Sequence, residues 1–309
     1  MNKIIVICGP TASGKTALSI NVAKRLDAEI VSADSMQIYK EMNVGTAKPD
    51  MIERGGVVHH LFDVVSVADD YNVSRYVSDA TACINDIFYR GKNVVLVGGT
   101  GMYIDTLINN VDLFDFENDI EYREYLAGIA EQDGPHVLLE KLRKVDPESA
   151  SRLHENDIKR VIRALEVHKV TGCTLTSLHE KSKRSRIYDP IFVSLNYEER
   201  QTLYDRINKR VDIMINNGWL DEARYLEKLD LSSTAAAAIG YKDLFDYLHG
   251  EVSLDDAIEN IKKKTRNYAK RQLTWFRKNK EIRWFTVENY SCFDDLCGDV
   301  INYILEQMR

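Results

Sequence analysis

The stretch Gly9-Pro10-Thr11-Ala12-Ser13-Gly14-Lys15-Thr16 fits the phosphate-binding pattern GxxxxGK[ST] at every fixed position. A short apolar, β-branched run at residues 3–8 precedes it, and apolar residues at helical spacing follow it. This order predicts a strand, a loop and a helix. In such a loop the backbone N–H groups and the helix dipole face an anion, while Lys15 adds a positive charge. We therefore expect all eight residues to bind phosphate or pyrophosphate, with Mg²⁺ held at Thr16.

The composition is that of an ordinary globular protein with room for one large domain and a smaller one. Of its 309 residues, 44% are hydrophobic and 29% are charged, and no apolar run approaches the roughly 20 residues that span a bilayer. We expect a cytoplasmic protein without a membrane partner.

The five cysteines lie far apart without a CxxC pair, so we expect buried apolar side chains rather than disulfides or a zinc site.

The charge is unevenly distributed. The net charge of −7 argues against a nucleic-acid partner, but ten Lys or Arg stand between residues 262 and 283 against the single acid Glu281. Residues 261–277 predict one helix that carries most of these cations. The segment is either an RNA-binding surface or a solvated basic face that balances charge within an acidic protein.

Two further segments are predicted to face the phosphate loop. Residues 28–34 predict a second strand that places Asp34 at its carboxyl end, where open parallel sheets bind ligands. The strand at residues 93–98 leads into Gly98, Gly99 and Thr100, where a P-loop ATPase or GTPase usually has a magnesium-binding acid. Thr100 can donate to a leaving oxygen, or cap the helix that is expected near Met102.

The middle of the chain predicts a helical insertion. Helical patterns replace strands after residue 109, so we expect an α/β core of the P-loop type at 1–112 and 191–309, with a parallel sheet, and an inserted all-helical domain at 113–190. One helix of the insertion has an apolar face that includes Ile158 and Leu165. Its cations would ordinarily be a solvated face.

The chain returns to the core through a strand at residues 191–195 and a helix. Asn196 is expected to cap this helix and Gly218 to end it. Arg206 and Arg210 share one stripe, either as a solvated pair or with Arg210 as a clamp for two phosphate oxygens.

Seven blocks of this chain together resemble the bacterial tRNA dimethylallyltransferases, and they cover nearly its whole length. The blocks are residues 9–16, 34–37, 45–49, 98–103, 156–166, 238–242 and 270–277. The family transfers a dimethylallyl group from its pyrophosphate to N6 of the adenosine just 3′ of the anticodon, and pyrophosphate leaves. The resemblance implies that tRNA, through its anticodon arm, and dimethylallyl pyrophosphate are the partners; we expect a monomer.

The resemblance also implies roles for particular residues. The expected catalytic residues are Lys15, Asp34, Thr100 and Arg210, with Asp34 as the base for N6 and Arg210 on the pyrophosphate. The expected tRNA contacts are Asp34, Ser35, Met36, Gln37, Thr100, Arg123, Lys159, Arg160, Val161, Ile162, Arg163, Lys242, Lys270 and Arg271. The chain departs from the family pattern at Thr265-Arg266-Asn267-Tyr268, where a Thr-Arg-Gln block is common, and at the four alanines 235–238.

Two other enzyme classes share part of this pattern. A P-loop kinase of a nucleoside or small metabolite would have the same strand, loop and helix, but it would not explain the Gly98–Gly99 turn or the basic segment. A prenyltransferase of free adenine nucleotides would need Asp34 but neither the insertion nor the cations. A non-enzymatic RNA-binding protein would need the cations but no phosphate loop.

Overall fold

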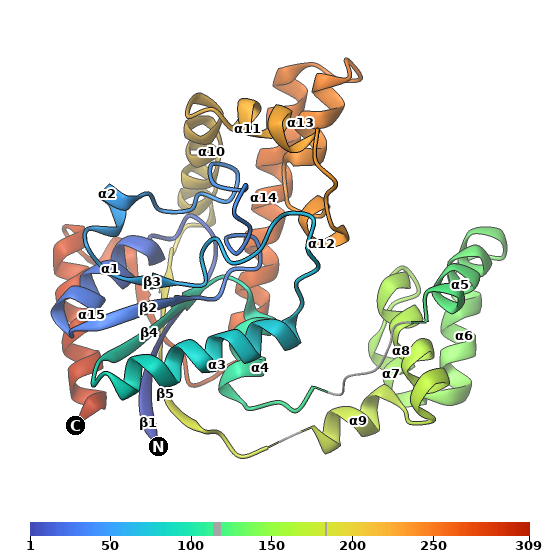
Figure 1. Ribbon diagram of the computed structural model, residues 1–309, viewed down its shortest axis with the longest axis horizontal. Helices are drawn as coiled ribbons and strands as arrows, with labels where there is room; N and C mark the ends of the chain where they lie inside the picture. The colour runs from blue at the N-terminus through green and yellow to red at the C-terminus, as the bar shows by residue number, and fades with distance from the viewer. Residues whose placement is uncertain (114–118, 183) are drawn as a thin grey trace. The chain divides into compact units, whose positions relative to one another are not determined.

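The protein consists of two compact units, described here from a computed structural model (Figure 1). The structure describes residues 1–113, 119–182 and 184–309. Unit 1 comprises residues 1–108 and 187–309, and unit 2 comprises residues 109–186. The expected boundaries were 112 and 191. Residues 114–118 and 183 of the expected insertion lie outside the described residues.

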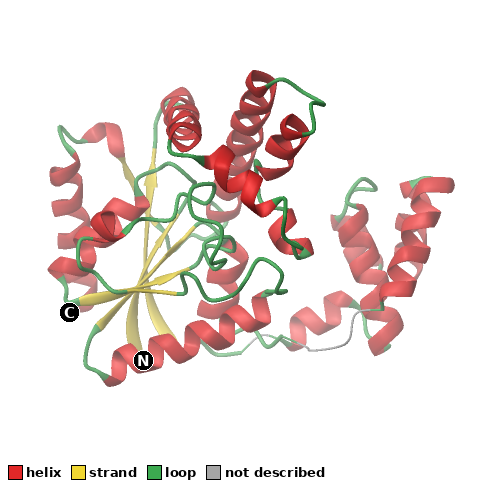
Figure 2. Ribbon diagram, turned by 45° about the horizontal axis from the view of Figure 1, so that its top comes forward, coloured by secondary structure: helices red, strands yellow, loops and turns green. Residues whose placement is uncertain are grey.

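Unit 1 is built on a six-stranded sheet in the order β3-β2-β4-β1-β5-β6, and every pair of strands is parallel. The strands are β1 (Asn2–Cys8), β2 (Ala28–Ser32), β3 (His59–His60), β4 (Asn93–Gly98), β5 (Tyr188–Asn196) and β6 (Arg283–Thr286). Helices cover both faces, which explains why the central strands are continuous apolar runs. The predicted α/β fold with a parallel sheet is confirmed. Because all strands point the same way, the loops after β1, β2, β4 and β5 meet at one edge (Figure 2).

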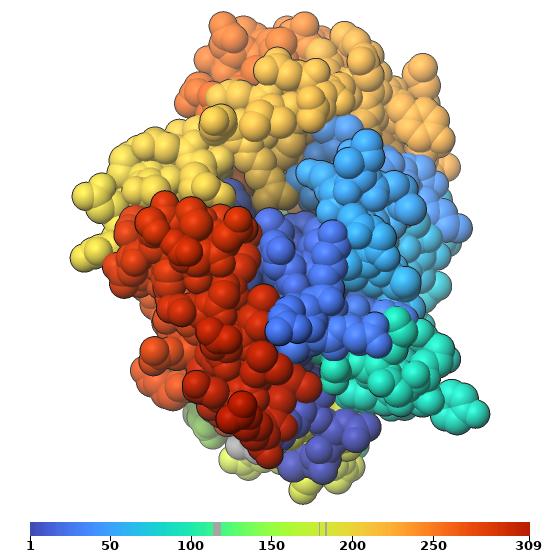
Figure 3. All heavy atoms as spheres, turned by 90° about the vertical axis from the view of Figure 1, so that its left-hand side faces the viewer, coloured from blue at the N-terminus to red at the C-terminus, as the bar shows by residue number. Residues whose placement is uncertain are grey.

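Alternate residues of β1 pack against different helices, as the period of two in a strand requires. Ile5 and Ile7 belong to the core beneath α1 (Lys15–Arg25) and α15 (Phe293–Met308), which lie side by side in Figure 3. Ile4 and Val6 belong to the core beneath α3 (Val73–Tyr89) and α4 (Gly101–Ile108).

The remaining helices of unit 1 lie in the segments that follow β2, β5 and β6. They are α2 (Met51–Arg54), α10 (Arg200–Asn216), α11 (Trp219–Leu226), α12 (Ser233–Ala236), α13 (Tyr241–Leu248), α14 (Leu254–Phe276) and the short 3₁₀ helix at Val287–Asn289. The expected Asn196 cap of α10 is wrong. Asn196 is still paired with Thr286 in the sheet, and the helix begins four residues later after Glu199.

The described residues of unit 2 form helices joined by short loops, without a strand. Its helices are α5 (Ile120–Gln132), α6 (Pro135–Val145), α7 (Pro147–Arg152), α8 (Ile158–Thr171) and α9 (Leu175–Lys181). They enclose a core of their own that includes Leu126, Leu138 and Leu165. Asp146 begins α7 by accepting a hydrogen bond from the backbone N–H of Ser149, with Pro147 in the first turn.

Two further expectations concern the whole chain. All five cysteines are free, and Cys8 and Cys297 are buried, but Cys292 is exposed at the start of α15, so the expectation of five buried cysteines is wrong there. Within residues 1–113, 119–182 and 184–309, no helix is long and apolar enough to cross a membrane.

Candidate active site

The phosphate loop joins β1 to α1 and turns through two glycines that no other residue could easily replace. Gly14 has φ 103°, a left-handed conformation, directly before the helix, and a Cβ on Gly9 would stand 2.5 Å from Ser194 Oγ. Lys15 Nζ donates to the carbonyl of Pro10 at 2.6 Å. Burial and the neighbouring Arg210 lower the pKa of Lys15 to about 8. The loop therefore holds a desolvated lysine, which gains from an anionic partner.

Asp34 follows β2 and faces the loop from the same sheet edge. Its Oδ1 accepts hydrogen bonds from the backbone N–H groups of Met36 at 2.9 Å and Gln37 at 3.4 Å. Oδ2 has no hydrogen-bond partner among the described residues. Asp34 also lies close enough to Lys15 and Arg210 to oppose the lowering of both pKa values. One carboxylate oxygen is thus fixed by a turn, and the other is available to a ligand.

The Thr100 hydroxyl contacts Ser35 and does not cap α4, and its expected donation to a leaving oxygen stays a prediction. Its Oγ1 accepts a hydrogen bond from the backbone N–H of Ser35 at 3.1 Å, and it makes a longer contact of 3.4 Å with Ser35 Oγ. Its carbonyl, not its hydroxyl, accepts from the first turn of α4. A Cβ on Gly98 would stand 2.1 Å from the carbonyl oxygen of Ala33. The second glycine turn therefore packs directly against the segment that carries Asp34.

Two arginines of α10 reach the phosphate loop. Arg210 Nη1 lies 3.4 Å from Thr11 Oγ1, and Arg206 Nε donates to the carbonyl of Ala12 at 2.9 Å. Burial lowers the pKa of Arg210, against the opposing effect of Asp34. Both side chains contact the loop, but only Arg210 is largely removed from solvent, whereas Arg206 stays exposed.

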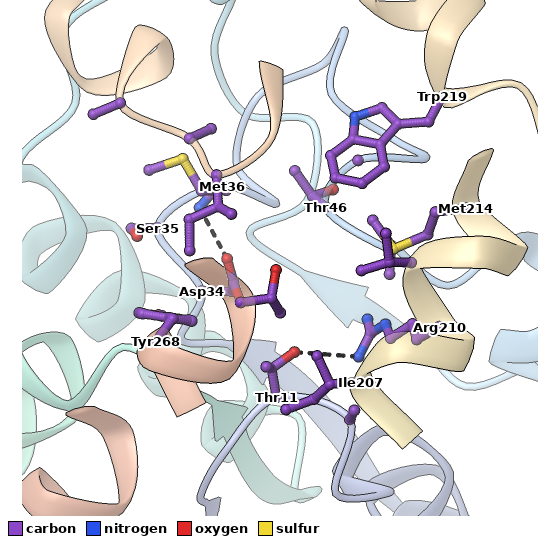
Figure 4. A pocket seen from close by; sticks show the side chains of 18 of the residues that line it. Thr11, Asp34, Ser35, Met36, Thr46, Ile207, Arg210, Met214, Trp219 and Tyr268 are labelled. Atoms are coloured by element: carbon purple, nitrogen blue, oxygen red, sulfur yellow. Dashed lines mark hydrogen bonds between the residues drawn. The ribbon is translucent and has the colours of Figure 1, made fainter. Parts of the chain in front are cut away.

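Of these groups, Thr11, Asp34 and Arg210 border one cavity of about 240 Å³ (Figure 4). Its polar side is formed by Thr11, Asp34, Arg210, Tyr268 and Arg271. Its apolar side is formed by Ile207, Val211, Met214, Trp219, Ala237 and Ala238. Burial, with Asp34 nearby, raises the pKa of Tyr268 to about 12, so this phenol stays protonated at neutral pH. The cavity joins an anion-binding end to an apolar wall.

Thr16 is the residue that the sequence predicts to hold magnesium. Thr16 is exposed at the start of α1, so its hydroxyl could ligate a cation. Within the described ranges no group of three or more His, Cys, Asp or Glu could hold a metal ion. Mg²⁺ often binds through few protein ligands, with phosphate oxygens and water completing six. Thr16 fits that type of site.

Three supporting residues were not identified from the sequence. Glu222 of α11 accepts hydrogen bonds from the backbone N–H groups of residues 43–45 and from the Tyr241 hydroxyl, which holds the loop bearing Thr46 against the cavity. Lys48 donates to the carbonyl of Tyr39 and to Asp63. Gln272 of α14 bonds to the phosphate loop. Only Gln272 had a local signal, because a polar residue there interrupts the buried stripe of Ile261, Ala269 and Phe276.

The expected tRNA contacts of unit 1 have mixed environments. Lys242, Lys270 and Arg271 are exposed on α13 and α14. Gln37 is turned inward, where its Nε2 donates to the carbonyl of Thr46 at 3.2 Å and its Oε1 lies 3.3 Å from Ser32 Oγ. Ser35 and Met36 line the cavity.

The expected contacts of unit 2 separate into three groups. Lys159 and Arg160 are exposed at the start of α8. Arg123 and Arg163 are both bound to Glu166, a fully buried carboxylate, with N–O distances of 2.7 Å. Val161 and Ile162 are buried in the core because the apolar stripe of α8 packs on α5 and α6. A contact of these two residues with tRNA would have to be made by their backbone atoms, and it stays a prediction.

Fold and site together define a class of protein. A parallel α/β sheet presents a phosphate-binding loop, a carboxylate and a buried arginine around one cavity at its carboxyl edge, and the usual magnesium-binding acid after β4 is replaced by glycine and threonine. This is a P-loop α/β enzyme built to bind an anion without the usual acid of phosphoryl-transfer sites.

Comparison with known proteins narrows the class to one family. Residues 37–279 match the family model described as IPP transferase, and residues 2–69 match the model described as isopentenyl transferase. The tRNA dimethylallyltransferases of Thermoanaerobacter sp. and Caldanaerobacter subterraneus subsp. tengcongensis are 47% and 44% identical to the chain, and each alignment covers 99% of both proteins. The chain belongs to the tRNA dimethylallyltransferase family.

Solved structures agree with this assignment. The tRNA isopentenylpyrophosphate transferase of Bacillus halodurans is 40% identical, with a TM-score of 0.74 over 99% of this chain and 96% of that one. A eukaryotic dimethylallyltransferase crystallised while acting on tRNA is 29% identical, with a TM-score of 0.81 over 99% of this chain and 80% of that one.

Proposed function

We propose that this cavity transfers the dimethylallyl group of dimethylallyl pyrophosphate to N6 of the adenosine 3′ of the anticodon in tRNA, and releases pyrophosphate. Dimethylallylation of a tRNA adenosine is the activity of the family. The observation that carries the finer proposal is the convergence of Asp34 and Arg210 on one cavity with an apolar wall, with Lys15 of the phosphate loop near enough to both for their charges to influence its pKa.

The donor would lie with its pyrophosphate on the loop and its hydrocarbon along the apolar wall. When the C1–O bond breaks, the electron pair leaves with the pyrophosphate oxygen. Fixed positive groups around that oxygen lower the barrier most, because their orientation costs nothing during the reaction. The loop N–H groups and Lys15 hold the pyrophosphate, and Arg210 can clamp two of its oxygens.

The acceptor requires a carboxylate. The exocyclic amine of adenine is a weak nucleophile because its lone pair is delocalised into the ring. As the N6–C1 bond forms, N6 gives up a proton, and Oδ2 of Asp34 would accept it. Thr100 holds the Asp34 segment through Ser35 N–H, so we assign it an orienting role beside the catalytic one expected from the sequence. The target base must leave its stack to enter the cavity.

Mg²⁺ at Thr16 would neutralise charge on the departing pyrophosphate. The protein's own part in that site is a single hydroxyl at the start of α1, so pyrophosphate oxygens and water would supply the other ligands.

We assign tRNA binding to exposed cations in both units. They are Lys242, Lys270 and Arg271 in unit 1 and Lys159 and Arg160 in unit 2, with Arg123 and Arg163 available through their exposed edges. The anticodon arm supplies the phosphates that these cations would neutralise. We further propose that the protein acts as a cytoplasmic monomer, which sedimentation of the purified chain would test.

One experiment separates the proposal from its alternatives. The protein is incubated with dimethylallyl pyrophosphate, Mg²⁺ and either unmodified tRNA or AMP, and the products are weighed by mass spectrometry. We expect a gain of one dimethylallyl unit on tRNA, and none when the adenosine 3′ of the anticodon is changed to guanosine. A gain on AMP alone would identify a free-nucleotide prenyltransferase, and phosphoryl transfer from ATP would identify a kinase.

A further inference from the structure

Gln272 joins three parts of the site that are far apart in the sequence. It lies on α14 and is only 5% exposed. Its Oε1 accepts a hydrogen bond from the backbone N–H of Thr11 in the phosphate loop at 2.8 Å. Its Nε2 donates to the carbonyl of Gly99 in the second glycine turn at 3.0 Å.

Only a primary amide of this length makes both bonds. The loop offers a donor and the glycine turn offers an acceptor, so the side chain between them must both accept and donate. A carboxylate would meet the Gly99 carbonyl with a second acceptor, and a hydrocarbon would leave both buried backbone groups without a partner. Gly99 is shaped for this contact, because a Cβ there would stand 2.1 Å from Gln272 Nε2.

The contact fixes the peptide of Thr11. That residue carries the hydroxyl that Arg210 approaches, and it begins the turn that leads through Ala12 to Lys15. Because its N–H donates to Gln272, rotation of the Thr11 peptide would break this hydrogen bond. The neighbours of Gln272 on the helix, Lys270 and Arg271, are exposed.

We propose that Gln272 is a positioning residue for the donor: it holds the phosphate loop against the Gly98–Gly99 turn in the conformation that binds pyrophosphate. This role rests on the proposed function for the identity of the donor, but the geometry predicts an effect on pyrophosphate itself.

The test uses the full-length protein and inorganic pyrophosphate with Mg²⁺, measured by calorimetry. Gln272→Met keeps the length of the side chain and removes both bonds. Gly99→Ala displaces the amide from the opposite side. Gln201→Met makes the same chemical change on the exposed surface of α10, where the Gln201 amide bonds only to Asp205 among the described residues. Each of the first two should weaken pyrophosphate binding by about 10-fold, and Gln201→Met should leave it unchanged.

A double-mutant cycle makes the test specific to the contact. In a Gln272→Ala background there is no amide for a new Cβ to displace, so Gly99→Ala should add less than about 2-fold to the loss. The KM for dimethylallyl pyrophosphate should rise, while the KM for tRNA and the melting temperature stay near those of the parent. Parental pyrophosphate affinity in Gln272→Met, or fully additive losses in the cycle, would overturn the proposal. The proposal would also be overturned if Gln272→Met and Gln272→Ala both lost tRNA affinity by as much as they lose pyrophosphate affinity, or if both lacked a melting transition.

The outcome can be distinguished from failure of the proposed function. If no dimethylallyl group appears on tRNA, the pyrophosphate affinities still decide the role of Gln272. If tRNA is modified and the Gln272 variants bind pyrophosphate normally, only the positioning role is wrong.

Discussion

At the scale of single residues, the pKa of Lys15 is lowered because folding buries its ammonium group. The hydrogen-bond acceptor of its Nζ is the neutral carbonyl of Pro10 and not a carboxylate. A pyrophosphate ion would supply the missing charge. Lys15→Ala should therefore lower turnover by roughly 10²–10³-fold, the usual effect of losing one fixed donor to a leaving oxygen. Filter binding should show that tRNA affinity is retained, and turnover near the parental value would remove Lys15 from the mechanism.

The same lysine makes pyrophosphate binding depend on pH. With a pKa of about 8 in the free protein, Lys15 is charged below that pH and loses its proton above it. A bound anion favours the charged form and raises the pKa, so binding near pH 8 should take up about half a proton and weaken as the pH rises further. Calorimetry in two buffers with different ionisation enthalpies measures this uptake. Lys15→Ala is the control, and an equal uptake in that variant would assign the proton to another group.

Asp34 is distinguished by having one oxygen fixed and the other available. Asp34→Asn keeps the size of the side chain and an oxygen for the Met36 N–H, but an amide cannot take the proton from N6. The single-turnover rate of transfer should fall by about 10²–10⁴-fold, with little change in donor affinity. Unchanged single-turnover rates would exclude Asp34 as the base.

At the scale of elements, α14 does not present its cations uniformly. Lys264 binds the buried carboxylate of Asp243 at 2.7 Å, and Lys262 binds Asp212 at 2.8 Å, so both act within the fold. Lys263, Lys270 and Arg271 are exposed and remain as candidates for RNA. The segment is therefore partly the charge-balancing face that the sequence offered as one alternative, and an RNA surface formed by its exposed cations stays a prediction.

Salt dependence tests that division of α14. Changing Lys263, Lys270 and Arg271 together to Gln should weaken tRNA binding and flatten the slope of log affinity against log salt by about one to three units. Lys264→Gln is the matched control: it should lower the melting temperature, because Asp243 loses its partner, and keep the parental slope. A parental slope in the triple variant would place the main RNA contacts in unit 2.

Helix α8 combines exposed and structural cations. Arg123 and Arg163 hold Glu166, and although burial alone would raise the pKa of that carboxyl, their hydrogen bonds lower it overall. Changing either arginine to Met should lower the free energy of opening of α5 and α8 by about 1 kcal/mol, a value discounted because both arginines are partly exposed. Hydrogen exchange measures it. Lys159→Gln and Arg160→Gln should reduce tRNA affinity alone, and equal destabilisation by all four changes would contradict this division.

At the scale of the whole molecule, every residue that lines the cavity belongs to unit 1. Pyrophosphate should therefore slow hydrogen exchange in the loops at residues 9–16, 34–48 and 98–100, and leave α5 to α9 unaffected. Unmodified tRNA should protect both units. Protection of unit 2 by pyrophosphate alone would show that donor binding is transmitted to the insertion.

The parallel sheet, the phosphate loop and the helical insertion were predictable because each depends on local periodicity or on a motif that fixes its own backbone. Residues 3–8 form a strand because they are an apolar, β-branched run, and residues 9–16 form a loop because the motif sets its own turn. The apolar stripe of α8 likewise indicates a buried helix face. The same stripe also limits what the family resemblance can imply, because a block that matches a tRNA-contacting segment includes Val161 and Ile162, whose side chains fill the core.

By itself, the sequence determined the kind of fold, the presence of a loop of the phosphate-binding pattern and the carboxylate that faces it, since those are properties of contiguous residues and of strand direction. Only the tertiary structure decided which polar groups meet. Gln272 reaches Thr11 and Gly99 across separations of 261 and 173 residues, and Glu222 reaches residues 43–45 across about 178. The start of α10 was likewise decided by sheet pairing of Asn196 and not by local capping. Contacts of this kind depend on how helices pack on the sheet, and no local pattern records that geometry.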